Sequence, residues 1–133
     1  MIATKEDVAA GLRNQISFVD VRPNHQYLGI NKSGKAKRAG TIPGAKNLPG
    51  HWVTINDGGM SRQKMELVKF YQAAAVPTEG DQVYFCNSGH WGALGWFVGS
   101  EIMGNKQAKL YDGSMIEWTT DPARPVDQKI VLK

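Results

Sequence analysis

The chain contains 133 residues, of which 41% are hydrophobic, and 16 basic against 12 acidic residues give it a formal net charge of +4. A chain of this size can bury one core but is too short for two domains of ordinary size. Its single cysteine excludes an intrachain disulfide and any multi-cysteine metal site. No apolar run is long enough to span a bilayer, and no signal-peptide pattern is present. We therefore expect one domain over residues 1–133, without a membrane span, in the cytoplasm, or in the periplasm if a leader has been removed.

The first third of the chain alternates a helix with short strands. Thr4, with Asp7 three residues later, predicts a capped helix that ends near Leu12. The elements expected next are a buried strand over 18–21, one or two helical turns over 23–28 and a short strand over 45–48.

The densest positive charge falls between two of these elements, at Lys32, Lys35, Lys37 and Arg38. Binding of nucleic acid would favour basic residues that alternate with aromatic ones or follow a helix, and this segment does neither. We expect a solvated loop, or a rim that attracts small anions, and no nucleic-acid partner.

The middle of the chain predicts a turn over 56–59 and then a helix. Ser61 is the expected N-cap, and Pro77 is expected to end the helix. Its apolar residues recur at helical spacing, at Leu67, Phe70, Tyr71 and Ala74.

The last third predicts a strand over 83–85, a helix over 90–103, a strand over 109–111 and a turn or short helix over 114–118. The expected buried stripe of the helix contains Trp91, Leu94, Gly95, Val98 and Ile102. Strands separated by helices indicate an α/β fold with a mainly parallel central sheet and helices on both faces. Ligands of such sheets bind at the carboxyl ends of the strands.

Cys86 lies where the pattern changes from strand to helix, with a glycine-containing loop over 87–92 after it. The N–H groups of such a loop are used by neither element, and the positive end of the following helix adds to them. The loop therefore favours a thiolate and can hold an anion. Gly89 suits it because glycine readily adopts positive φ. The alternative is a buried structural cysteine, since many free cysteines are small core side chains.

Four blocks of the sequence occur in the order of one known family. They are residues 18–23 (FVDVRP), 39–49 (AGTIPGAKNLP), 86–92 (CNSGHWG) and 110–118 (LYDGSMIEW). Together they resemble the rhodanese (sulfurtransferase) family over about residues 4–126, which leaves 127–133 as a C-terminal extension. The last block is most similar to the catalytic C-terminal domain of tandem thiosulfate and mercaptopyruvate sulfurtransferases. The resemblance implies a single rhodanese-like domain and leaves open whether the chain is part of a tandem protein.

The resemblance also implies a sulfurtransferase with Cys86 as its catalytic residue. The thiolate would take the outer sulfur of a small anionic donor, form a persulfide and pass the sulfur to cyanide, a thiol or a protein, with no cofactor and no metal. The implied active-site loop contains Asn87, Ser88, Gly89, His90, Trp91 and Gly92. The implied supporting residues are Asp20, Arg22 and Gln26, with Arg22 in an ion pair to Asp20 or Glu117.

Three positions depart from the family pattern. Many members have Arg or Lys where this chain has Asn87, thiosulfate-using members often have Arg at Gln26, and the loop often ends in Arg or Thr where Trp91 stands. We therefore expect thiosulfate to be a poor donor. His90 is either a replacement cation beside the thiolate or a surface residue. Trp91 is expected to pack or to form a pocket wall.

Other functions remain as alternatives. A cysteine phosphatase or arsenate reductase needs an arginine six residues after the cysteine, and Gly92 occupies that position. A sulfur-carrier or binding module with little or no catalysis is compatible with the missing cations. A redox sensor would lack a resolving cysteine in this chain. His25 and His51 have no metal-ligand spacing with each other or with Cys86.

Overall fold

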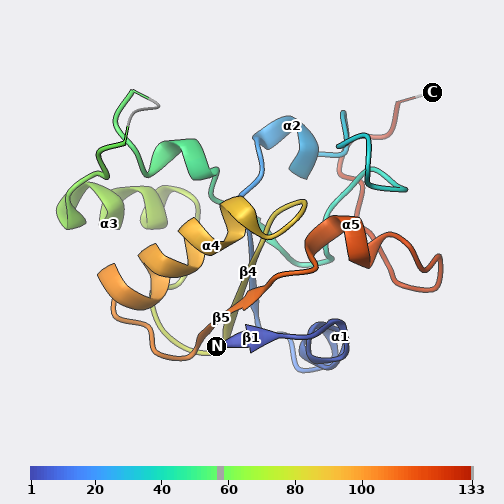
Figure 1. The fold of residues 1–133 in the computed structure, drawn as a ribbon, viewed down its shortest axis with the longest axis horizontal. Helices are drawn as coiled ribbons and strands as arrows, with labels where there is room; N and C mark the ends of the chain where they lie inside the picture. Colours follow the sequence, from blue (N-terminus) through green and yellow to red (C-terminus); the bar gives the residue numbers. More distant parts are fainter. Residues whose placement is uncertain (57–58, 133) are drawn as a thin grey trace.

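The computed structural model describes residues 1–56 and 59–132, which form a single α/β domain (Figure 1). Its centre is a five-stranded sheet with the strand order β1-β5-β4-β2-β3, and every strand pairing is parallel. The strands are β1 (Ile2–Ala3), β2 (Ser17–Asp20), β3 (Lys46–Asn47), β4 (Gln82–Phe85) and β5 (Ala108–Tyr111). The predicted parallel sheet is confirmed, and β1 was not predicted because two residues carry no periodic pattern.

Helices connect the strands and cover the sheet. They are α1 (Lys5–Arg13), α2 (Asn24–Tyr27), the 3-10 helix η1 (Gly50–Trp52), α3 (Lys64–Ala73), α4 (His90–Phe97), the π-helix η2 (Val98–Ile102) and α5 (Ser114–Trp118). The helix expected over 90–103 is therefore an α-helix that continues as a π-helix. In the described part of the chain, no helix is both long and apolar enough to cross a membrane.

The core has two parts, one on each face of the sheet. Tyr84 of β4 packs with residues of α3 and η2, such as Leu67 and Val98. Its neighbours Val83 and Phe85 belong to the other cluster, with residues of α1 and α5. Successive residues of a strand point to opposite faces, so one short strand anchors both clusters. This confirms helices on both faces, with α3 and α4 on one side and α1 on the other (Figure 1).

The predicted cap of the first helix is present. The Thr4 hydroxyl accepts the Asp7 N–H at 3.1 Å, and the Asp7 carboxylate accepts the Thr4 N–H at 2.9 Å. These reciprocal bonds satisfy N–H groups that the first helical turn leaves without partners. The hydrogen bond from the Thr4 backbone also holds the pKa of the Asp7 carboxyl below its usual value.

The predicted cap of the third helix is wrong. Ser61 forms an antiparallel bridge with Thr54, so its backbone belongs to a small ladder that precedes the helix. The helix begins at Lys64, and the Gln63 N–H donates to the Glu66 carboxylate at 3.2 Å. The turn expected over 56–59 lies partly outside the described residues. The helix ends at Ala73, before Pro77.

The segment after residue 126 returns to the domain. Asp127 and Thr41 exchange two backbone hydrogen bonds, at 2.8 and 3.0 Å, and the Ile130 N–H donates to the Leu28 carbonyl at 2.9 Å. These bonds attach the extension to the connection between β2 and β3.

Candidate active site

Cys86 directly follows β4, at the carboxyl edge of the sheet. Its side chain is only 2% exposed and belongs to the core cluster on the α3–α4 face. The Gly89 N–H donates to the Cys86 Sγ, with 3.1 Å between nitrogen and sulfur. Gly89 has φ of 89°, in the left-handed region, and this conformation turns its N–H back toward the cysteine.

The N-terminal end of α4 adds further N–H donors around this contact. Among the described residues, no hydrogen-bond acceptor is found for the backbone N–H groups of Asn87, Ser88, His90, Trp91 and Gly92. A helix N-terminus with unused N–H groups stabilises negative charge. The loop at 87–92 therefore places several backbone N–H groups without acceptors next to Cys86, the only cysteine of the chain.

A second helix holds the other side of the loop. The Cys86 N–H donates to the Ser114 Oγ at 3.0 Å, and that hydroxyl donates to the Tyr111 carbonyl at 2.8 Å. The N–H groups of Met115 and Ile116, in the first turn of α5, donate to the carbonyls of Cys86 and Asn87, each at 3.0 Å. Because these two carbonyls are bound to α5, the peptide groups that follow Cys86 and Asn87 are held in one orientation.

The turn before α5 leaves no room for a side chain at Gly89. A Cβ placed on Gly89 would lie 2.4 Å from the Asp112 carboxylate and 2.6 Å from its carbonyl oxygen. Glycine at this position is therefore required twice, by its backbone conformation and by the close approach of Asp112.

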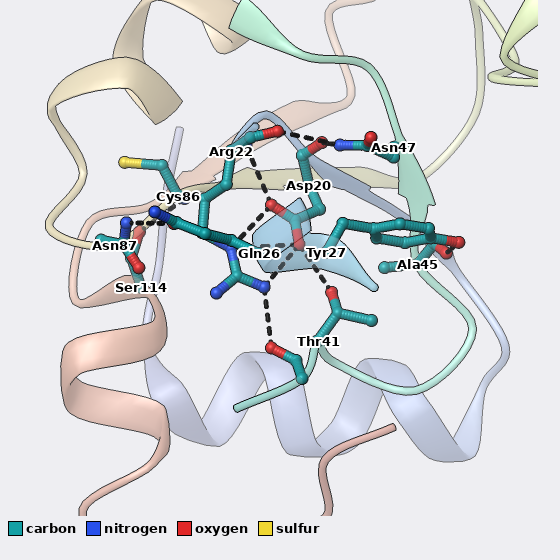
Figure 2. A network of polar contacts seen from close by, with 11 residues as sticks. Asp20, Arg22, Gln26, Tyr27, Thr41, Ala45, Asn47, Cys86, Asn87 and Ser114 are labelled. Atoms are coloured by element: carbon teal, nitrogen blue, oxygen red, sulfur yellow. Dashed lines mark hydrogen bonds and ion pairs between the residues drawn. The ribbon is translucent and has the colours of Figure 1, made fainter. Parts of the chain in front are cut away.

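Asp20 and Arg22 form a buried ion pair at the end of β2 (Figure 2). The Arg22 Nη2 lies 2.7 Å from the Asp20 Oδ2 and also donates to the Gly40 carbonyl at 2.8 Å, while the Thr41 hydroxyl donates to the same carboxylate at 2.8 Å. Of the two partners expected for Arg22, the structure has Asp20, and Glu117 instead accepts from the Tyr111 hydroxyl. The Arg22 side chain is 1% exposed, and its hydrogen bonds join the end of β2 to the segment at Gly40 and Thr41.

Gln26 and Asn87, the two neutral replacements, contact each other. The Asn87 Nδ2 donates to the Gln26 Oε1 at 2.7 Å, which connects α2 to the cysteine loop. The Asn87 Oδ1 is buried and has no hydrogen-bond partner among the described residues. The two positions at which the family resemblance led us to expect cations thus form a neutral amide pair. Figure 2 shows this pair beside Cys86, whose sulfur is directed away from the Asp20–Arg22 pair.

The remaining loop side chains face outward. Ser88, His90 and Trp91 are exposed, and the rings of His90 and Trp91 meet edge to face with centroids 6.4 Å apart. Among the described residues, the hydrogen bond to the Cys86 sulfur comes from the Gly89 N–H, and none comes from the His90 side chain. Trp91 is 49% exposed, so it leaves the predicted buried stripe. It packs against Gly50 and lines a hollow of about 120 Å³ with Val21, Pro23 and His51.

The described residues contain no cluster of His, Cys, Asp or Glu side chains that could hold a metal ion.

Sequence reasoning missed the contact of Ser114 with Cys86. Ser114 has φ of 54°, which is unusual for a residue with a side chain, and it is fully buried. Its place in the block at 110–118 was the only available signal. The link between residues 28 positions apart depends on β4 and β5 being neighbours.

Comparison with known proteins identifies the family. The model of the rhodanese-like domain matches residues 4–121, and the chain belongs to this family. A thiosulfate sulfurtransferase of Corynebacterium glutamicum is 31% identical over 118 residues, which cover 84% of this chain and 38% of that protein. The sulfur carrier protein TtuD of Thermus thermophilus is 34% identical over 110 residues, which cover 77% of this chain and 38% of the relative. The chain spans less than half the length of these curated relatives.

A solved structure confirms the fold. The Tum1 protein from Saccharomyces cerevisiae superposes with a TM-score of 0.78 at 19% identity, over 96% of this chain and 46% of that one. The predicted rhodanese-like α/β domain is therefore correct.

Proposed function

We propose that the protein is a sulfurtransferase in which Cys86 carries a sulfane sulfur as a persulfide. The observation that carries this proposal is the 3.1 Å contact between the Gly89 N–H and the Cys86 Sγ, at a helix N-terminus with further unused N–H groups. Membership of the rhodanese-like family supports it, as do relatives named thiosulfate sulfurtransferase and sulfur carrier protein.

The reaction has two half-reactions. The Cys86 thiolate attacks the outer sulfur of the donor, and with thiosulfate the new Sγ–S bond forms while the S–S bond of the donor breaks and sulfite leaves with the electron pair. Cyanide then attacks the terminal sulfur of the persulfide, thiocyanate leaves, and Cys86 regains its thiolate. A covalent intermediate of this kind predicts ping-pong kinetics.

The backbone N–H groups of the loop stabilise negative charge in both half-reactions. Negative charge rests first on the Cys86 thiolate and then on the persulfide, and donors fixed before the reaction stabilise it without reorganisation. The bonds from Ser114 and from the first turn of α5 keep these groups in place.

The donor is proposed to be less charged than thiosulfate, or to bring its own contacts. Thiosulfate is a compact dianion, and the pair of Asn87 and Gln26 offers it amide groups in place of cations. A charge-assisted hydrogen bond contributes about 1.5–3 kcal/mol, roughly twice a neutral one. Thiosulfate should therefore react slowly.

A sulfur carrier is the second candidate. The neutral amide pair and the 2% exposure of Cys86 favour it, because a carrier needs to store sulfur and to release it to one protein partner, without rapid turnover of small molecules. The name of the Thermus thermophilus relative points the same way.

Intact-mass spectrometry tests the proposal. The wild-type protein is incubated with thiosulfate or with mercaptopyruvate, and a gain of one sulfur atom that maps to Cys86 and disappears with cyanide is expected. No gain with either donor would overturn the persulfide mechanism. Rapid loading with slow release to cyanide would identify the carrier.

A further inference from the structure

A second and larger pocket lies next to the hollow at Trp91. It has a volume of about 460 Å³ and shares His51 with that hollow, which Trp91 of the cysteine loop also lines. It is lined by His51, Trp52, Thr54, Asn56, Arg62, Phe70 and Ala73.

Two aromatic rings form the apolar part of this pocket. Trp52 of η1 and Phe70 of α3 meet edge to face, with centroids 5.9 Å apart, and both are partly buried against the core. Each ring is therefore held in place while part of it lines the cavity. Fixed ring edges and faces of this kind favour a flat apolar or aromatic ligand.

Arg62 adds an oriented cation to the same pocket. Its Nε donates to the Trp52 carbonyl at 3.0 Å, and its guanidinium lies 5.5 Å from the centre of the Phe70 ring. Glu66 neutralises it only loosely, because the Arg62 Nη1 and the Glu66 Oε2 are 3.7 Å apart. The described residues provide Arg62 with no other carboxylate partner. Terminal guanidinium N–H groups thus remain able to bind a carboxylate.

We propose that this pocket binds a small aromatic carboxylate, with its ring against Trp52 and Phe70 and its carboxylate on Arg62. The volume of about 460 Å³ is within the usual range of small-molecule sites. The pocket shares His51 with the hollow that Trp91 lines, so we assign it to the non-reacting part of a sulfur donor or acceptor. That use rests on the proposed sulfurtransferase function, whereas the binding itself does not.

Nuclear magnetic resonance titration of the full chain with phenylacetate tests the binding. The indole N–H signal of Trp52 should shift in a saturable way at millimolar phenylacetate, while the signals of Trp96 and Trp118, whose indoles donate to the Ala108 and Pro125 carbonyls, should stay in place. Absence of a saturable Trp52 shift up to about 10 mM would overturn the proposal.

Variants separate the cation from the rings. Arg62→Gln should weaken phenylacetate binding roughly tenfold and leave the binding of the neutral phenylacetamide unchanged. Phe70→Leu, which keeps an apolar side chain but removes the ring, should weaken the binding of both phenylacetate and phenylacetamide. Arg13→Gln, at an exposed arginine of α1, is the matched control and should change neither. An Arg62→Gln protein that still prefers the carboxylate to the amide would refute the assignment of Arg62.

Failure of the two proposals can be told apart. Binding of phenylacetate is read from Trp52, and persulfide formation is read from the mass of Cys86. If the protein binds phenylacetate but gains no sulfur, the pocket proposal stands and the sulfurtransferase proposal fails. If it gains sulfur but does not bind phenylacetate, only the pocket proposal fails.

Discussion

Ser114 fixes the backbone of Cys86 by accepting its N–H at 3.0 Å while donating to the Tyr111 carbonyl at 2.8 Å. The serine adopts φ of 54°, a conformation that costs a residue with a Cβ about 1–2 kcal/mol. The two buried hydrogen bonds, together with those from the first turn of α5 to the loop carbonyls, offset this cost.

Ser114→Ala should therefore lower both stability and sulfur transfer. Two buried backbone groups lose their partner, which destabilises the fold by about 1–3 kcal/mol. A loosened cysteine loop should reduce kcat/KM by roughly tenfold, because small displacements of reacting groups are costly. Urea unfolding and steady-state kinetics measure the two effects.

Thr119→Ala is the matched control for this variant. The Thr119 hydroxyl is also buried at the end of α5, where it donates to the Met115 carbonyl at 2.7 Å and accepts the Lys37 N–H at 2.9 Å. Among the described residues it has no hydrogen bond to the cysteine loop. It should cost stability but not activity. Equal kinetics for the alanine variants at 114 and 119 would contradict the positioning role of Ser114.

Cys86→Ser should abolish persulfide formation and leave the fold intact. Serine has nearly the same shape but cannot form the S–S bond that stores the transferred atom. Mass spectrometry after incubation with a donor, and a thermal melt, provide the two readouts. Sulfur transfer that persists in this variant would refute the covalent mechanism, since the chain has no other thiol.

Asn87→Lys, alone or together with Gln26→Arg, should improve the use of thiosulfate. Either change replaces a neutral amide of the pair by a cation, and a charge-assisted contact predicts a gain of about one to two orders of magnitude in kcat/KM, mostly through KM. Asn14→Lys, at the exposed end of α1, adds the same charge elsewhere and should have no effect. Unchanged kinetics in the Asn87 variants would mean that the loop N–H groups already supply the anion contact.

Gly89→Ala should damage both fold and activity more than Gly44→Ala. Both glycines have positive φ, 89° and 84°, so both substitutions carry a backbone cost of about 1–2 kcal/mol. Only at Gly89 would the new Cβ also meet Asp112, whereas nothing lies within 4 Å of it at Gly44. Urea unfolding and persulfide formation, measured for both variants, separate the steric contact from the backbone strain. Equal losses of stability and activity in the two variants would contradict a steric contact between Asp112 and a Cβ at position 89.

The buried tyrosine pair predicts sensitivity to alkali. The hydroxyls of Tyr71 and Tyr84 are 2.7 Å apart, and burial raises the pKa of Tyr71 to about 12 and that of Tyr84 in the same direction. A folded pKa above the unfolded value of about 10 means that stability is complete below pH 10 and falls as the pH rises toward 12, by about 1.4 kcal/mol per pH unit for each tyrosine. The double variant Tyr71→Phe/Tyr84→Phe, which leaves neither hydroxyl unpaired, should lose less stability between pH 8 and pH 11 in urea unfolding. Equal losses would contradict the assignment.

Local pattern predicted most of the architecture. The reciprocal cap of Thr4 and Asp7, the strand–Cys86–helix transition and the parallel sheet all follow from short-range signals, and each is confirmed. The cap of α3 was missed because Ser61 is a good cap by residue type, while its pairing with Thr54 depends on a bridge to a residue outside the local pattern. Where the local sequence allows Ser61 either to cap a helix or to form a bridge, such a pairing determines which conformation forms.

The site was less predictable because its key contacts join distant segments. The choice of Asp20 over Glu117 as the partner of Arg22 depends on the exact end of β2. The hydrogen bond between Asn87 and Gln26 crosses 61 residues. Residue type indicated that both positions are neutral where the family resemblance led us to expect cations. Only the fold shows that the two amides form a hydrogen bond with each other.

In the cysteine loop, the main chain and the side chains face different surroundings. The groups proposed to hold the sulfur are backbone N–H donors fixed by Gly89 and by α5, whereas the side chains of Ser88, His90 and Trp91 are exposed. Under the proposed function, side-chain substitutions at these exposed positions change the surface that a sulfur partner would meet and leave the backbone donors in place.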